Sequence, residues 1–296
     1  MNRKAVRVLS VSVAVAAALT SVAACGGSDG DAEGKKGGEG TVLKLDPIAA
    51  LREVQAKTGE ARSARIEGST EMGDLMSLEQ TGVLGWSDGL TGSMEITYTG
   101  GSMARSMQAS GVSGPMQARY FKDGYAVNMG EAAARRLAGK SWISYSYDDL
   151  AKLAGPAGSV LKDQLQNSTP QQAVKALLAS GDVRKVGQEK IRGVQATHYS
   201  GTVDVAELSA ANSKLDAAQL EAFRKQLDAA GITAQQVDVW IDKDSLPVKK
   251  VESGEMKNGR FDSTVYYSDY GAKVSAERPP ASQTVDFREL AGRAGS

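Results

Sequence analysis

The side chains that could carry out chemistry are few, because the 296-residue chain has one Cys and one His. One thiol cannot form a disulfide framework or a multi-cysteine metal site, and one imidazole cannot build a His–His metal centre. His198 lies in a strand-like run and shares a face with Val194 and Ala196. With no partner evident, we expect a structural or hydrogen-bonding role for this His, no catalytic residue, no metal and no cofactor.

The single cysteine, Cys25, stands at the end of a segment organised like a secretory signal. A basic start is followed by an uncharged, mostly apolar stretch at 8–20, and Ala23 and Ala24 directly precede the cysteine. The stretch is too short to span a bilayer, which needs about 20 residues. The order of residues resembles the bacterial lipobox, which implies diacylglycerol transfer to the Cys25 thiol and cleavage before it. We therefore expect residues 1–24 to be a lipoprotein signal peptide, the alternative being a secreted protein with one stray cysteine.

A Gly-rich tether is expected to follow the lipidated cysteine over residues 25–40. Seven of the fifteen residues at 26–40 are Gly and six are charged, so this segment should span about 20 Å as a flexible coil. Two or three acyl chains anchor a protein stably. We expect a cell-membrane location on the extracytoplasmic face, held by the lipid anchor. The balance of 35 basic and 35 acidic residues argues against a nucleic-acid partner.

One short motif suggests a hydrolase, because Gly85-Trp-Ser87-Asp-Gly89 matches the G-x-S-x-G pattern. A nucleophile elbow requires a strand before the Ser and a helix after it. Residues 90–98 instead alternate between apolar and polar side chains, which is typical of a strand. The motif is therefore better explained as a hairpin turn, and an envelope hydrolase that uses Ser87 is the least favoured hypothesis.

We expect residues 41–296 to form a single domain, whose helices and strands position any functional site. Asp46-Pro47 predicts a helix start, and Gly59 a helix end. Period-two patterns, turn dipeptides and apolar stripes predict the remaining elements. Strands are expected around 76–86, 90–98, 102–109, 116–122, 125–129, 182–190, 194–205 and 236–270, with a hairpin at Asn258-Gly259, and helices around 147–178 and 215–230. This order indicates an α+β fold with one apolar sheet face.

Three later segments resemble a known family. They are Gly193–Gly201, Val239–Pro247 and Tyr266–Gly271. Together with the lipobox and the helix after the tether, they resemble the LppX/LprG family of actinobacterial lipoproteins, which is similar in turn to the LolA/LolB lipoprotein carriers. The resemblance implies a strongly curved antiparallel sheet, an incomplete β-barrel, that wraps helices around a hydrophobic cavity. It also implies binding or transport of acylated lipids across the envelope.

Apolar side chains on the expected inner face are the candidates to line this cavity. Six of the eight methionines that follow Met1 fall between 72 and 116, and flexible methionines adapt to ligands of varied shape, although simple core filling remains the alternative. The residues expected to line the cavity are Met76, Leu78, Leu84, Met94, Ile96, Leu150, Leu153, Leu161, Val239 and Ile241.

The sequence thus predicts a non-enzymatic, membrane-anchored lipoprotein whose partner is a lipid or acylated ligand. The alternative function is an interaction module that docks on an envelope protein complex or sensor, with a filled core in place of a cavity.

Overall fold

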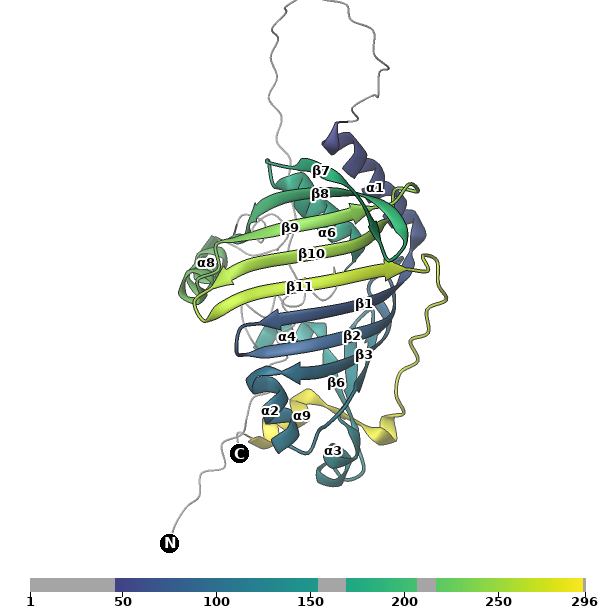
Figure 1. Ribbon diagram of the computed structural model, residues 1–296. Coiled ribbons are helices and arrows are strands. Elements are labelled where there is room, and N and C mark those ends of the chain that lie inside the picture. The colour runs from purple at the N-terminus through teal and green to yellow at the C-terminus, as the bar shows by residue number, and fades with distance from the viewer. Residues whose placement is uncertain (1–45, 154–168, 207–216, 295–296) are drawn as a thin grey trace, which may run out of the picture.

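A single twelve-stranded sheet organises the computed structural model, which describes residues 46–153, 169–206 and 217–294. The strand order is β12-β6-β5-β4-β3-β2-β1-β11-β10-β9-β8-β7. Two meanders therefore lie side by side, and the antiparallel pair β1–β11 joins them. Figure 1 shows the sheet curving around helices on its far side.

The first meander and its helices come from the N-terminal half of the chain. Its strands are β1 (Ser63–Met72), β2 (Met76–Gly85), β3 (Thr91–Gly100), β4 (Met116–Phe121), β5 (Gly124–Asn128) and β6 (Trp142–Ser146). The helices of this half are α1 (Pro47–Ala61), α2 (Gly101–Ala109), α3 (Gly130–Arg136) and α4 (Tyr147–Leu153).

The second meander follows α6 (Pro170–Ala179). Its strands are β7 (Arg184–Ile191), β8 (Val194–Asp204), β9 (Ala234–Ile241), β10 (Pro247–Met256) and β11 (Gly259–Ser268). The other elements are α8 (Ala217–Ala230), a short 3₁₀ turn at Ala281–Gln283, β12 (Thr284–Asp286) and α9 (Phe287–Ala294). The hairpin predicted at Asn258-Gly259 joins β10 to β11.

The predicted fold class is confirmed, with one difference in strand direction. The fold is α+β, and the sheet is not closed, since β7 and β12 stand at its two ends. The sheet is mixed because β12 pairs parallel with β6. The chain reaches that edge through an irregular segment after β11 that runs along the side of the molecule (Figure 1), and this long return allows a parallel entry.

Helix α1 begins where the sequence predicts, but it ends later. The Asp46 side chain accepts a hydrogen bond from the Ile48 backbone N–H at 3.1 Å, as an N-cap residue does. The helix runs past Gly59 to Ala61, so Gly59 is not its end. A Cβ at Gly59 would lie 2.5 Å from Gln171 Nε2, which shows that this glycine admits the close approach of α6.

The strand expected at 102–109 is wrong, because these residues form helix α2. The buried side chains there are Ala104 and Met107, which are three residues apart and share a helix face. Gly101, at φ +80°, turns the chain sharply, and a Cβ there would lie 2.5 Å from the Leu75 carbonyl oxygen. The turn that glycine permits and the three-residue spacing together favour a helix.

Two apolar clusters pack on the helix side of the sheet, which we call the inner face. The larger cluster joins β1–β5, β11 and the start of α4, and includes Ile66, Met94, Tyr125, Tyr147 and Val265. The second cluster joins β8 and β9 to α1 and α6, and includes Leu51, Val174, Leu177, Val237 and Val239. The larger cluster thus extends across the β1–β11 pair, and the second cluster fills the space between β8, β9 and the two helices.

Truncation of one α1 side chain tests the second cluster. Leu51 is fully buried, so Leu51→Ala should lower the free energy of unfolding by about 2–5 kcal/mol. Ile48, one turn away and 39% exposed, is the matched control, and Ile48→Ala should change the stability by less than about 1 kcal/mol. Urea unfolding monitored by circular dichroism measures both variants. Equal losses would contradict the assignment of Leu51 to the core.

Candidate functional site: the inner face of the sheet

The structure distributes the predicted cavity residues over both clusters of the inner face. Leu84, Met94 and Ile96 lie together in the larger cluster. Val239 and Ile241 lie in the second cluster, beside α1 and α6. The remaining predicted residues have three different positions: Met76 and Leu78 are buried on β2, Leu150 packs against the larger cluster, and the Leu153 side chain and Leu161 lie outside the described residues. Their role in lining a cavity stays a prediction.

A row of polar side chains crosses the inner face between the two clusters. Strand register places Glu252 of β10 opposite Ser263 of β11, and Ser263 opposite Thr70 of β1. The hydroxyl oxygens of Thr70 and Ser263 lie 3.1 Å apart in a buried hydrogen bond. On the next row Lys250 lies opposite Val239 and Val265, both of which belong to apolar clusters. We call Lys250, Glu252, Ser263 and Thr70 the polar row.

The polar row contains a buried ion pair. Lys250 Nζ donates a hydrogen bond to Glu252 Oε2 at 2.8 Å, and the two side chains are 13% and 2% exposed. Burial of Lys250 opposes its charged form, but the Glu252 carboxylate and the Tyr267 phenol together outweigh this effect, so the pKa of Lys250 is raised. Oε1 of Glu252 is also buried, and it has no hydrogen-bond partner among the described residues.

Sequence reasoning missed this pair. The alternation of side chains along β10 places Lys250 and Glu252 on the inner face of the sheet, beside the valines of β9. Charged residues at inward positions of a half-buried strand are unusual. This unusual pattern was the one feature of the sequence that could have indicated the pair. An irregularity in register between Pro247 and Lys249 decides which face each side chain occupies, and the sequence gives no sign of that irregularity.

Stacked tyrosines form the far part of the inner face, next to α4 and α9. The ring of Tyr125 stacks on Tyr145 at 4.8 Å, and Tyr145 stacks on Phe287 at 4.9 Å. Burial raises the pKa of Tyr120 and of Tyr145 to about 12, so both phenols stay protonated at neutral pH. This part of the face presents neutral aromatic surface with hydroxyl groups.

His198 lies on the opposite, outer face of the sheet. Its Nε2 is 2.7 Å from Asp238 Oδ1, and its ring stacks on Trp240 at a centroid distance of 4.2 Å. Trp240 in turn donates a hydrogen bond to Glu189 of β7. These contacts fasten the β7–β8 hairpin to β9, which agrees with the structural or hydrogen-bonding role expected for this His.

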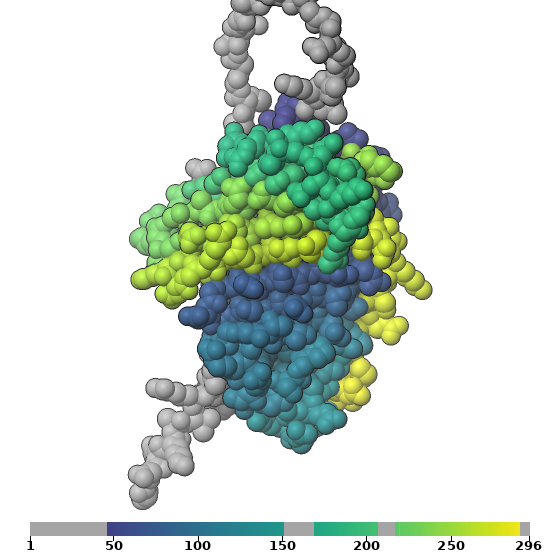
Figure 2. Space-filling view, viewed as in Figure 1, coloured from purple at the N-terminus to yellow at the C-terminus, as the bar shows by residue number. Residues whose placement is uncertain are grey.

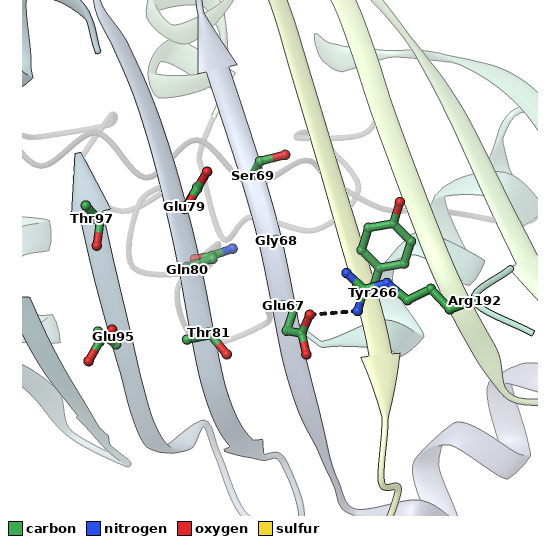
Figure 3. Close-up of a pocket in the computed structure, with 10 residues that line it drawn as sticks. All are labelled: Glu67, Gly68, Ser69, Glu79, Gln80, Thr81, Glu95, Thr97, Arg192 and Tyr266. Atoms are coloured by element: carbon green, nitrogen blue, oxygen red, sulfur yellow. Dashed lines mark hydrogen bonds and ion pairs between the residues drawn. The ribbon is translucent and has the colours of Figure 1, made fainter. Parts of the chain in front are cut away.

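The tip of the β7–β8 hairpin reaches across the outer face and borders a polar groove. Figure 2 shows this hairpin over its neighbouring strands, with its tip near β1. Arg192 at the tip lies 2.6 Å from Glu67 of β1 and 3.8 Å from the centre of the Tyr266 ring. The groove has a volume of about 480 Å³ and is also lined by Glu79, Thr81, Glu95 and Thr97 (Figure 3).

Ser87 lies in a turn between two strands, as the sequence predicts. Strand β2 ends at Gly85, a short bridge joins Ser87 to Gly89, and β3 follows. No helix follows this Ser, so the geometry of a nucleophile elbow is missing. In the described ranges, no cluster of three or more His, Cys, Asp or Glu residues could hold a metal ion, and no helix has the length and hydrophobicity to span a membrane.

Solved structures similar to this chain include the lipoproteins that its sequence resembles. LppX of Mycobacterium tuberculosis matches with a TM-score of 0.46 and 16% identity over 78% of this chain and 98% of LppX. LprF of Mycobacterium bovis matches with a TM-score of 0.43 and 13% identity over 79% of this chain and 97% of LprF. A LolA superfamily protein of Nitrosomonas europaea matches at 0.26 and 10%, over 78% and 94%.

Sequence relatives are much more similar. A 31.2 kDa protein from the rplA–rplJ intergenic region of Streptomyces griseus is 59% identical over 86% of this chain and 84% of that protein. A Streptomyces coelicolor protein named "Putative lipoprotein" is 45% identical over 97% of this chain and 96% of that protein. No family model matches the chain. At these identities and coverages, the chain belongs to the family that contains these two Streptomyces proteins.

Proposed function

We propose that this protein is a non-enzymatic lipoprotein that binds or carries a lipid or acyl group between the inner face of its sheet and its helices. The observation that carries the proposal is the curved sheet itself, whose inner face presents Leu, Ile, Val, Met and Tyr side chains over both meanders. An acyl chain gains about 0.8 kcal/mol for each CH₂ group that leaves water. An apolar concave surface is therefore the expected binding surface for such a ligand.

Features of the sequence support the proposed location. Cys25 follows a signal-like segment, and a Gly-rich stretch separates it from α1. A lipid anchor with a short tether would hold the sheet close to the outer surface of the cytoplasmic membrane, where acylated ligands are found. The name of the S. coelicolor relative supports the same interpretation. The ten predicted lining residues, Cys25 and the domain limits 1–24, 25–40 and 41–296 remain part of this proposal.

Native mass spectrometry of residues 26–296 tests lipid binding, because this mature chain contains every helix and strand that the structure describes. The chain should co-purify with, or take up from envelope lipid extracts, a mass that organic extraction identifies as a lipid. The inner-face substitution Met94→Asp should abolish retention, since it places a charge within the larger cluster. The outer-face substitution Thr97→Asp on the same strand is the control and should retain lipid.

A second candidate is the interaction module, which the outer-face groove favours. Glu79 and Glu95 stand beside the Arg192–Glu67 ion pair there, and such a polar hollow suits a protein partner better than an acyl chain. A mature chain that stays free of lipid after incubation with envelope lipids would contradict the carrier proposal and favour this candidate.

Substitution of the single cysteine tests the anchor. Cys25→Ser should abolish metabolic labelling of the protein with a palmitate analogue, because the substituted chain has no thiol to accept the diacylglycerol. It should also move the protein from the washed membrane fraction into the medium or leave it unprocessed. The neighbouring substitution Ser28→Ala is the control and should keep the label. Labelling of the Cys25→Ser chain would show that Cys25 is not the modified residue.

A further inference from the structure

The Lys250–Glu252 pair is an unusual feature for the interior of a lipid-binding sheet. Three of its four strand neighbours on the same face are valines: Val239 and Val265 beside Lys250, and Val237 beside Glu252. Val237 and Val239 are fully buried. A buried carboxylate normally satisfies both of its oxygens, because each unpaired oxygen keeps a desolvation penalty. Here Lys250 satisfies Oε2, and Oε1 has no partner within the described ranges.

Small residues flank the ion pair on this part of the inner face. Glu252 stands opposite Ser263, and Gly68 stands opposite Val265 on the neighbouring strand. The hydroxyl groups of Ser263 and Thr70 share one hydrogen bond, so each has a polar partner. The buried side-chain atom of the polar row that has no partner among the described residues is an acceptor, Glu252 Oε1, and its complement is a donor.

The charges of the row limit the chemistry of that donor. The Lys250 ammonium balances the Glu252 carboxylate, so the pair has no net charge. A phosphate or carboxylate on the ligand would be repelled by Oε1, and an ammonium would be repelled by Lys250 Nζ. A neutral hydroxyl can donate to Oε1 and adds no charge to a buried site.

We propose that Glu252, held by Lys250, is a binding residue for a free hydroxyl group close to the acyl chains of a neutral lipid. The inference rests on the proposed function, since it requires a lipid on the inner face. The site thus selects a partly acylated neutral lipid over its fully esterified form. The acyl chains would lie on the apolar clusters on either side of the polar row.

A competition between two lipids that differ in one hydroxyl tests the proposal. Residues 26–296 are incubated with phosphatidylcholine vesicles that contain equal amounts of dipalmitoylglycerol and its acetyl ester, and the bound lipid is extracted and quantified. The two lipids have the same palmitoyl chains, and the ester has no hydroxyl donor. We expect the wild-type chain to prefer dipalmitoylglycerol about ten-fold or more, as befits a hydrogen bond to a charged group.

A double substitution separates recognition from simple size selection. Lys250→Met with Glu252→Leu replaces the buried pair by side chains of similar volume, a change that such sites often tolerate without loss of stability. The double variant should bind both lipids and lose the preference, with its urea unfolding midpoint as the check on folding. The control, Arg192→Met with Glu67→Leu, removes an ion pair of the same charge from the outer face and should keep the preference.

Each outcome decides a different question. Equal binding of both lipids by the wild-type chain overturns the hydroxyl site and leaves the proposed function standing. A preference that survives in the folded double variant also overturns the site, because the acetyl group then acts through its size. Binding of neither lipid, together with a lipid-free chain from the envelope extract, contradicts the proposed function itself.

Discussion

The pairing of β1 with β11 is the interaction on which the rest of the structure depends. Seven residues of β1, from Arg65 to Glu71, pair antiparallel with residues from Ser268 to Asp262. These strands come from opposite ends of the folded region, and their pairing merges two meanders into one sheet. Without this pairing, each meander would expose an edge strand and half of an inner face. The buried Thr70–Ser263 hydrogen bond spans the same seam across 193 residues of sequence.

The inner face around the seam has two apolar clusters, and the charged pair of β10 lies between them. The larger cluster crosses the seam, since it contains Ile66 of β1 and Val265 of β11, and the second cluster lies on β8 and β9. The polar row lies where β10, β11 and β1 meet. An ion pair at such a place is poor evidence for added stability, since removing two charges from water offsets most of their attraction.

On the outer face, charged and aromatic side chains connect the β7–β8 hairpin to the neighbouring strands. Arg192, Glu67 and Tyr266 connect the hairpin tip to the seam, and His198, Asp238 and Trp240 connect the base of the same hairpin to β9. A small apolar cluster of Ile191, Ala196, Trp240 and Val248 joins the hairpin to β9 and β10. The contacts of the tip are largely exposed, so each adds little to stability. Together they hold the hairpin over the outer surface of β9–β11.

Local features of the chain follow from the sequence alone, because each depends on neighbours a few residues away. The Asp46 cap, the Asn258-Gly259 hairpin and the strand-turn-strand context of Ser87 are of this kind. The resemblance to a known family predicted the open, curved sheet. The two Streptomyces relatives establish the family to which the chain belongs. The strand prediction fails at α2 because Gly101 turns the chain at φ +80° and the start of the helix bonds to Leu75, which is remote in sequence. Tertiary structure alone decided the Lys250–Glu252 pair, because an irregularity in β10 and the register with β9 and β11 determine which side chains face inward. A shift of one residue would have moved both charges to solvent, and only the packed sheet sets that register.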